Sequence, residues 1–242
     1  MSALLHAEAL KLRTLRLTWV VVGLALALSG TIGFAGARIA QDAGDQVELS
    51  TVAAAPAQAM WFLGIVVAVV ASAGEFQHRT IRTTLLAAPH RRAVLVGKSV
   101  VAAAFGAVLA ALGSVVAVTA AWVTAALDSA PVEAGASWWH VAGAVAVGAL
   151  WAVLATGIGI LTRSTAIAVA AILLWRFVGE GILPVVTGNA EIVDWTPTAL
   201  ASEIVGIAPA HVGAATAGAT LAAYTVAVCG LAALLFVRRD PT

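Results

Sequence analysis

Long apolar stretches alternate with short polar ones along the whole 242-residue chain. A membrane-spanning helix needs ~20 mostly apolar residues, and six stretches meet that requirement. They cover residues 17–37, 55–74, 99–124, 138–161, 165–184 and 212–236. All seven prolines fall at the ends of these stretches or between them, where no helical hydrogen bond is lost to lipid. The pattern predicts an all-α integral membrane protein, with six transmembrane helices in a single domain over residues 1–242.

Composition supports lipid as the solvent of much of the surface. Hydrophobic residues make up 62% of the chain and charged residues only 10%, against roughly a quarter in soluble domains. Too few charges are present to cover a soluble fold of this length. The net charge of +1 also provides no general attraction to nucleic acid.

The basic residues predict the orientation in the membrane. With six spans, 11 of the 13 lysines and arginines fall on one side, and basic residues are retained in the cytoplasm. These residues are Lys11, Arg13, Arg16, Arg79, Arg82, Arg91, Arg92, Lys98, Arg163, Arg238 and Arg239. Both termini are therefore predicted to be cytoplasmic. Arg38 lies on the other side, and Arg176 lies inside a span.

Two segments outside the spans have unusual patterns. Residues 2–16 place Leu5, Ala9 and Leu12 near helical spacing among polar residues, which favours an amphipathic helix along the inner membrane surface over a flexible basic lead-in. The connection 38–54 is acidic and is predicted to be exposed outside. Residues 185–211 are too apolar for an ordinary loop, and we predict a re-entrant segment that dips into the outer leaflet.

The segment 75–92, between spans two and three, is the most polar part of the chain. Ile81, Leu85 and Leu86 can share one helical face, and Pro89 ends the helix. The other faces carry Arg79, Arg82 and Thr83. The residues alone leave two hypotheses open, namely a helix that docks a partner and a basic loop held by anionic lipid.

Four charged residues lie near or inside spans, and three of them, Arg176, Glu180 and Glu75, are candidate functional residues. Arg176 and Glu180 are four residues apart on span five, so they can pair, either as a polar patch on a substrate path or as a structural ion pair near the outer interface. Glu75 is either a surface carboxylate or a partner for the nearby arginines. Lys98, in a Gly-Lys-Ser sequence that lacks the rest of a phosphate-binding loop, is expected to extend to the interface.

Catalytic motifs are missing from the sequence. It contains no H-E-x-x-H zinc motif and no G-x-S-x-G nucleophile elbow, and its five histidines have no ligand-spaced partners. We therefore expect no enzymatic activity, no metal site and no cofactor bound by this chain.

Taken together, these features resemble the membrane permeases of type-2 ATP-binding-cassette (ABC) exporters. Such permeases often carry an acidic residue at the end of span two, then Gly-Thr, a leucine-rich stretch, Pro, Arg and Gly-Lys at the start of span three. The matching positions are Glu75, Thr80, Leu85, Leu86, Pro89, Arg91 or Arg92, Gly97 and Lys98. One position departs from the pattern, because Arg79 stands where glycine is usual.

The resemblance implies a mechanism and partners. Residues 79–88 would form a coupling helix on a separate cytoplasmic ABC ATPase, which would bind ATP and magnesium. A second permease subunit, identical or related, would complete the pathway in the plasma (inner) membrane of a bacterium. The partner-coupling residues would be Glu75, Arg79, Thr80, Arg82, Leu85, Leu86 and Pro89.

The sequence alone leaves alternative functions open. An ion-coupled secondary transporter would be expected to show several carboxylates in mid-span, whereas only Arg176 and Glu180 come close. A membrane-embedded enzyme needs clustered catalytic residues, and a non-transporting membrane anchor needs none. The apolar spans suit a lipid-like or amphipathic cargo.

Overall fold

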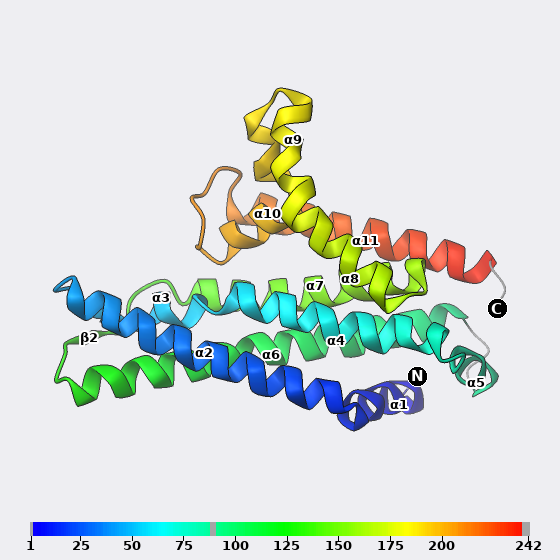
Figure 1. The fold of residues 1–242 in the computed structure, drawn as a ribbon, viewed down its shortest axis with the longest axis horizontal. Helices are drawn as coiled ribbons and strands as arrows, with labels where there is room; N and C mark the ends of the chain where they lie inside the picture. The colour runs from blue at the N-terminus through cyan, green and yellow to red at the C-terminus, as the bar shows by residue number, and fades with distance from the viewer. Residues whose placement is uncertain (1, 88–90, 239–242) are drawn as a thin grey trace.

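A computed structural model describes residues 2–87 and 91–238, and within them it has six helices long and apolar enough to cross a membrane (Figure 1). They are α2 (Arg16–Asp42), α3 with α4 (Leu49–Gln77), α6 (Arg91–Leu127), α7 (Trp139–Thr162), α8 to α9 (Thr165–Thr187) and α11 (Ala214–Arg238). Helices α2, α4, α6 and α7 lie side by side, whereas α8 and α9 lean away from them. The prediction of six candidate spans is confirmed.

Short elements gather at the two ends of the bundle (Figure 1). Helices α1 (Ser2–Thr14) and α5 (Ile81–Ala87) lie at the end where α11 finishes, which we call the α5 end. At the opposite end, two-residue strands β1 (Val47–Glu48) and β2 (Val132–Glu133) pair in parallel, with Val47 opposite Val132. This second end is called the β1–β2 end.

Helix α7 is the centre of the packing, because it contacts α4, α6 and α11. Ala144, Gly148 and Ala152 are buried on α7, and Gly106 of α6 lies against Gly148 and Ala152. A Cβ atom at Gly106 would collide with the carbonyl oxygen of Gly148, so these two backbones can approach only because neither residue has a side chain.

Two predictions about connections are corrected by the packing. The segment 38–54 is an exposed connection only in its middle, where residues 42–46 are exposed. Before this stretch α2 continues to Asp42, and after it α3 (Leu49–Ala54) packs against α6 and α7. Val47 is fully buried there beside α6. Pro184 is not at a span end either. It lies inside α9 (Glu180–Thr187), just after the π-helical turn η1 (Trp175–Gly179) has shifted the backbone hydrogen bonding.

The apolar segment 185–211 folds back onto the bundle. After α9 it forms a 3-10 turn, η2 (Ala190–Trp195), and then α10 (Pro197–Ile204), which packs on α11 and α7. Glu203 of α10 is buried, and its carboxylate accepts hydrogen bonds from the backbone N–H groups of residues 211, 212 and 213, where α11 begins. Protein contacts of the kind that a re-entrant segment requires are therefore present, and its depth in a membrane stays a prediction.

Candidate functional site

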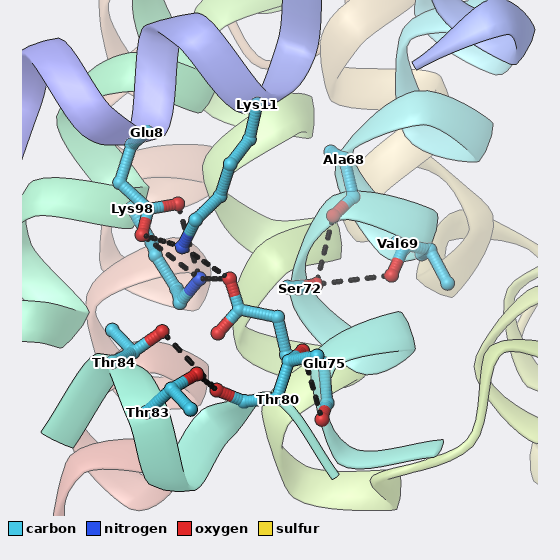
Figure 2. Close-up of polar contacts among 10 residues, drawn as sticks. All are labelled: Glu8, Lys11, Ala68, Val69, Ser72, Glu75, Thr80, Thr83, Thr84 and Lys98. Carbon is cyan, nitrogen blue, oxygen red and sulfur yellow. Dashed lines mark hydrogen bonds and ion pairs between the residues drawn. The ribbon is translucent and has the colours of Figure 1, made fainter. Parts of the chain in front are cut away.

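Four charged side chains from three helices meet at the α5 end, as Figure 2 shows. The Lys98 ammonium of α6 lies 2.5 Å from Glu75 Oε1 of α4 and 3.1 Å from Glu8 Oε2 of α1. The Lys11 ammonium of α1 lies 2.7 Å from the same Glu75 oxygen and 2.7 Å from Glu8 Oε1. We call Glu8, Lys11, Glu75 and Lys98 the charge cluster. It is neutral overall, with two carboxylates and two ammonium groups.

Local sequence explains why the charge cluster forms at this point. Glu8 and Lys11 are three residues apart on α1 and face the same side. Gly97 lets α1 approach α6, because a Cβ atom there would lie 3.0 Å from Leu4 Cδ2 of α1. The next residue, Lys98, then reaches both carboxylates. α1 is therefore held against the bundle by charges as well as by apolar contact.

Burial makes these contacts matter energetically. The side chain of Lys98 is only 4% exposed, and both glutamates are buried, whereas Lys11 is 39% exposed. Removing one partner from a buried ion pair costs ~3–5 kcal/mol, because the remaining charge is left without compensation. Desolvation lowers the pKa of Lys11, but the hydrogen bonds that its ammonium donates to Glu75 and Glu8, together with their negative charges, outweigh it, so the pKa is raised above 10.5.

The sequence-based expectations for this region are partly wrong. Glu75 is not a surface carboxylate, and its ion-pair partners among the described residues are the two lysines and not an arginine. Lys98 does not extend to the interface, because α1 covers it. On α1 itself, Leu5 and Leu12 are half-buried, but Ala9 is exposed and Glu8 is the buried residue between the two leucines, so the predicted apolar face is wrong at Ala9. Glu75 of α4 pairs with Lys11 and Lys98 of α6 pairs with Glu8, and these ion pairs turn the charged side of α1 toward the bundle.

The turn between α4 and α5 contains Arg79, the residue that replaces the usual glycine. Arg79 has a φ of 57°, in the left-handed region that glycine occupies at little cost. It follows the C-terminus of α4, and its N–H donates to the Phe76 carbonyl at 3.2 Å. The turn therefore keeps the geometry that a glycine would give, at a conformational cost of ~1–2 kcal/mol.

Threonines organise the start of α5 (Figure 2). The Thr80 hydroxyl donates to the Glu75 carbonyl at 3.5 Å, and the Thr83 hydroxyl donates to the Thr80 carbonyl at 2.6 Å. Thr84 donates its hydroxyl to the same carbonyl at 3.4 Å. These bonds link α5 directly to the turn of α4 that carries Glu75, so α5 and the charge cluster share one backbone segment.

The two faces of α5 differ. Ile81 is buried, and Leu85 packs partly against the same apolar cluster. That cluster joins α4, α5, α6, α7 and α11 through Phe76, Ile81, Leu95, Ile160, Ala232 and Phe236. Leu86, in contrast, is 84% exposed, so the prediction that it shares a face with Ile81 and Leu85 is wrong. The cause is the spacing: Ile81 and Leu85 are four residues apart, whereas Leu86 follows Leu85 directly and points elsewhere.

The other predicted coupling residues are placed as follows. Arg82 lies on the exposed side of α5. Pro89, and residue 88 at the end of the predicted coupling helix, lie outside the described residues. At the far side of the molecule, Arg176 Nη1 and Glu180 Oε2 are 3.5 Å apart, so the predicted pair forms. It is distant in the fold from the charge cluster, on the leaning helix of Figure 1.

Sequence reasoning missed Glu8 and Lys11 as site residues, and it noticed Lys98 without predicting its partners. The Glu8–Lys11 spacing on one helix face was the only local signal. The partners themselves lie 64 and 90 residues apart along the chain, which no local pattern records.

Six apolar helices, with a buried charge cluster and an exposed short helix at one end, define a multi-pass membrane protein. The family model described as ABC-2 family transporter protein matches residues 4–179, a range that includes α1, the charge cluster and α5. The match covers more than half of the chain, so the protein belongs to this family and is an ABC transporter permease, as the sequence resemblance predicted. No curated protein matches the chain.

Proposed function

We propose that this permease is a subunit of an ATP-driven exporter, coupled to a separate ABC ATPase that docks at the α5 end. The α5 end faces the cytoplasm, because most basic residues of the chain lie there. The membrane is the plasma (inner) membrane of a bacterium, and ATP and magnesium are bound by the ATPase. A second permease subunit, identical or related, completes the pathway within the lipid.

The exposure of Leu86 is the observation that carries the proposal. A large apolar side chain on a short helix at the basic end is exposed, while Ile81 on the opposite face anchors the helix. Apolar residues surrounded by a polar rim are typical of protein docking surfaces. Lipid contact alone does not require an anchored helix between two spans, so α5 serves as the coupling helix.

The packing supports a route from α5 to the spans. Ile81 contacts an apolar cluster that includes the ends of α4, α6, α7 and α11. Phe76 in that cluster meets Phe236 of α11 edge to face, with ring centroids 6.0 Å apart. The neighbouring residue, Glu75, belongs to the charge cluster. A displacement of α5 by the ATPase is thereby passed to four spans and to α1.

Co-purification with Leu86→Asp tests the docking. Tagged full-length chain is purified from its host in mild detergent, and the ATP hydrolysis that accompanies it is measured. We expect wild type to carry ATPase activity and Leu86→Asp to lose most of it. Leu127→Asp is the matched control, since Leu127 is similarly exposed but ends α6 at the β1–β2 end.

The outcome separates the alternatives. Equal ATPase activity with Leu86→Asp and Leu127→Asp would show that α5 is not the docking helix. Wild-type protein without any associated ATPase, combined with transport driven by a sodium or proton gradient, would replace the proposal with a secondary transporter.

A further inference from the structure

A large cavity opens on the side of the molecule where α8 and α9 lean away from the bundle (Figure 1). Its volume is about 510 Å³, within the ~300–1,000 Å³ of small-molecule sites. The walls come from α7, α8, η1, α11 and the segment around η2, and they are almost entirely apolar. Trp151, Trp175, Trp195 and Tyr224 line it, together with one charged residue, Arg176. No residue of the charge cluster and no residue of α5 lines the cavity.

Arg176 is an unusual residue for this wall. It lies near the middle of the span Thr165–Thr187, where a charge costs ~2.5–3.5 kcal/mol on insertion scales. Its only hydrogen bond among the described residues is the 3.5 Å contact with Glu180, although a guanidinium has five N–H donors. The side chain is 33% exposed. Among the described residues, the Nε donor of this guanidinium is buried without a protein acceptor, so the cavity wall carries a cation with unused hydrogen-bonding capacity.

The backbone at Arg176 is also irregular. Residues Trp175–Gly179 form a π-helical turn, a distortion that occurs frequently at functional sites. Gly179 is needed there, because a Cβ atom would lie 2.9 Å from the Trp175 ring. The turn thus allows the Trp175 ring to lie against the helix backbone while both Trp175 and Arg176 line the cavity.

A second cavity provides a contrast. It has a similar volume, about 520 Å³, and is lined by Arg38 of α2 among apolar residues of α6. Arg38, however, is 2.8 Å from Asp128 and also contacts Gln41 and the Phe34 ring. Its charge is therefore compensated within the protein. Arg176 also has a carboxylate and a ring beside it, with Glu180 at 3.5 Å and the Phe177 ring centroid at 5.8 Å. It differs from Arg38 in its longer ion-pair distance and in its Nε atom, which is buried without a partner among the described residues.

We propose that the cavity at Arg176 binds a single-chain amphipathic anion. The acidic head pairs with the Arg176 guanidinium, and the chain lies against Trp151, Trp175 and Trp195. A cationic amphiphile would meet an arginine, and a neutral one would leave its donors unused. The use of this site for cargo rests on the proposed export function, but the binding does not.

Binding can be measured on the full-length chain alone, in nanodiscs of neutral phosphatidylcholine, without any ATPase. The probe is 12-bromododecanoate, whose bromine quenches tryptophan fluorescence on contact. 12-Bromododecanol, with the same chain and no charge, gives the background from partition into lipid. We expect saturable quenching by the acid, at least tenfold tighter than any binding of the alcohol.

Variants locate the site. The double variant Arg176→Gln with Glu180→Gln stays neutral, so it removes the cation without leaving Glu180 unpaired. It should weaken binding of the acid about tenfold, as expected for the loss of a charge-assisted hydrogen bond. Arg38→Gln, in the other cavity, should bind as wild type does. Trp175→Phe with Trp195→Phe should reduce the maximal quenching.

Several results would overturn the inference. The first is equal binding of 12-bromododecanoate and 12-bromododecanol. The second is that Arg38→Gln weakens binding of the acid as much as the double variant at Arg176 and Glu180 does. The third is that the maximal quenching by the acid is unchanged after both tryptophan replacements. Competition by an anionic phospholipid added to the nanodiscs would show that a bilayer lipid occupies the cavity instead. None of these results affects the Leu86 test, so a failure here and a failure of the export proposal are distinguishable.

Discussion

Removal of the Lys98 ammonium is the sharpest test of the charge cluster. Lys98→Met keeps much of the length of the side chain, but Glu75 loses a 2.5 Å contact and Glu8 loses contacts of 3.1 and 3.2 Å. The two carboxylates then share Lys11, which is partly exposed to water. A buried charge left without its partner costs ~3–5 kcal/mol, so we expect a loss of that size in the free energy of unfolding.

The cost can be relieved in part if α1 detaches. Glu8 would then reach water. Trypsin needs a locally unfolded backbone, so it would cut faster at Arg13 and Arg16, whose side chains are already exposed. The free energy of unfolding is measured by titration of detergent micelles with dodecyl sulfate, and the release of α1 is measured by limited proteolysis. In Lys98→Met we expect the free energy of unfolding to fall and the cleavage of α1 by trypsin to become faster.

Two further variants test whether the effect of Lys98→Met comes from buried charge. Arg38→Met breaks the half-exposed pair with Asp128, which is 2.8 Å long, and should cost at most ~1 kcal/mol. The triple variant Lys98→Met, Glu8→Gln and Glu75→Gln removes the buried charges together and should recover most of the loss. If Lys98→Met costs no more than Arg38→Met, or if the three changes are simply additive, the cluster does not hold α1.

Two other predictions follow from the same end of the molecule. The pKa of Lys11 is raised in the folded state, so its contribution to the free energy of unfolding should be fully present below pH 10.5 and be lost as the pH rises through the higher folded-state pKa. Proteolysis of α1 across alkaline pH should therefore accelerate in wild type, whereas Lys11→Met should lack this pH dependence. Arg79→Gly should raise the free energy of unfolding by ~0.5–1 kcal/mol through relief of the left-handed φ, whereas Arg79→Ala, which keeps a Cβ atom, should give no such gain.

Much of the fold was predictable because a span depends on the local density of apolar residues. Lipid imposes this requirement on each stretch separately, so the six spans could be located without knowing which helix packs on which. The loop after span two was predictable for a similar reason. Its polarity and the Glu75-to-Lys98 motif are local, and they carried the resemblance that the family match confirmed.

The roles of individual side chains at the site required the tertiary structure. Leu85 and Leu86 are equivalent in composition, and only the packing of α5 buries one and exposes the other. Arg79 looked like a departure from the motif, but its φ shows that the glycine geometry is retained at a cost.

By itself, the sequence determined the number of spans and the family, whereas the tertiary structure decided which charges meet. Lys98 was expected at the interface because its neighbours in sequence are apolar and a lysine can extend to water. α1 lies over it instead and supplies Glu8 from 90 residues away. Electrostatic pairing acts through space at a few ångströms, so partners on separate helices leave no periodic signal along the chain.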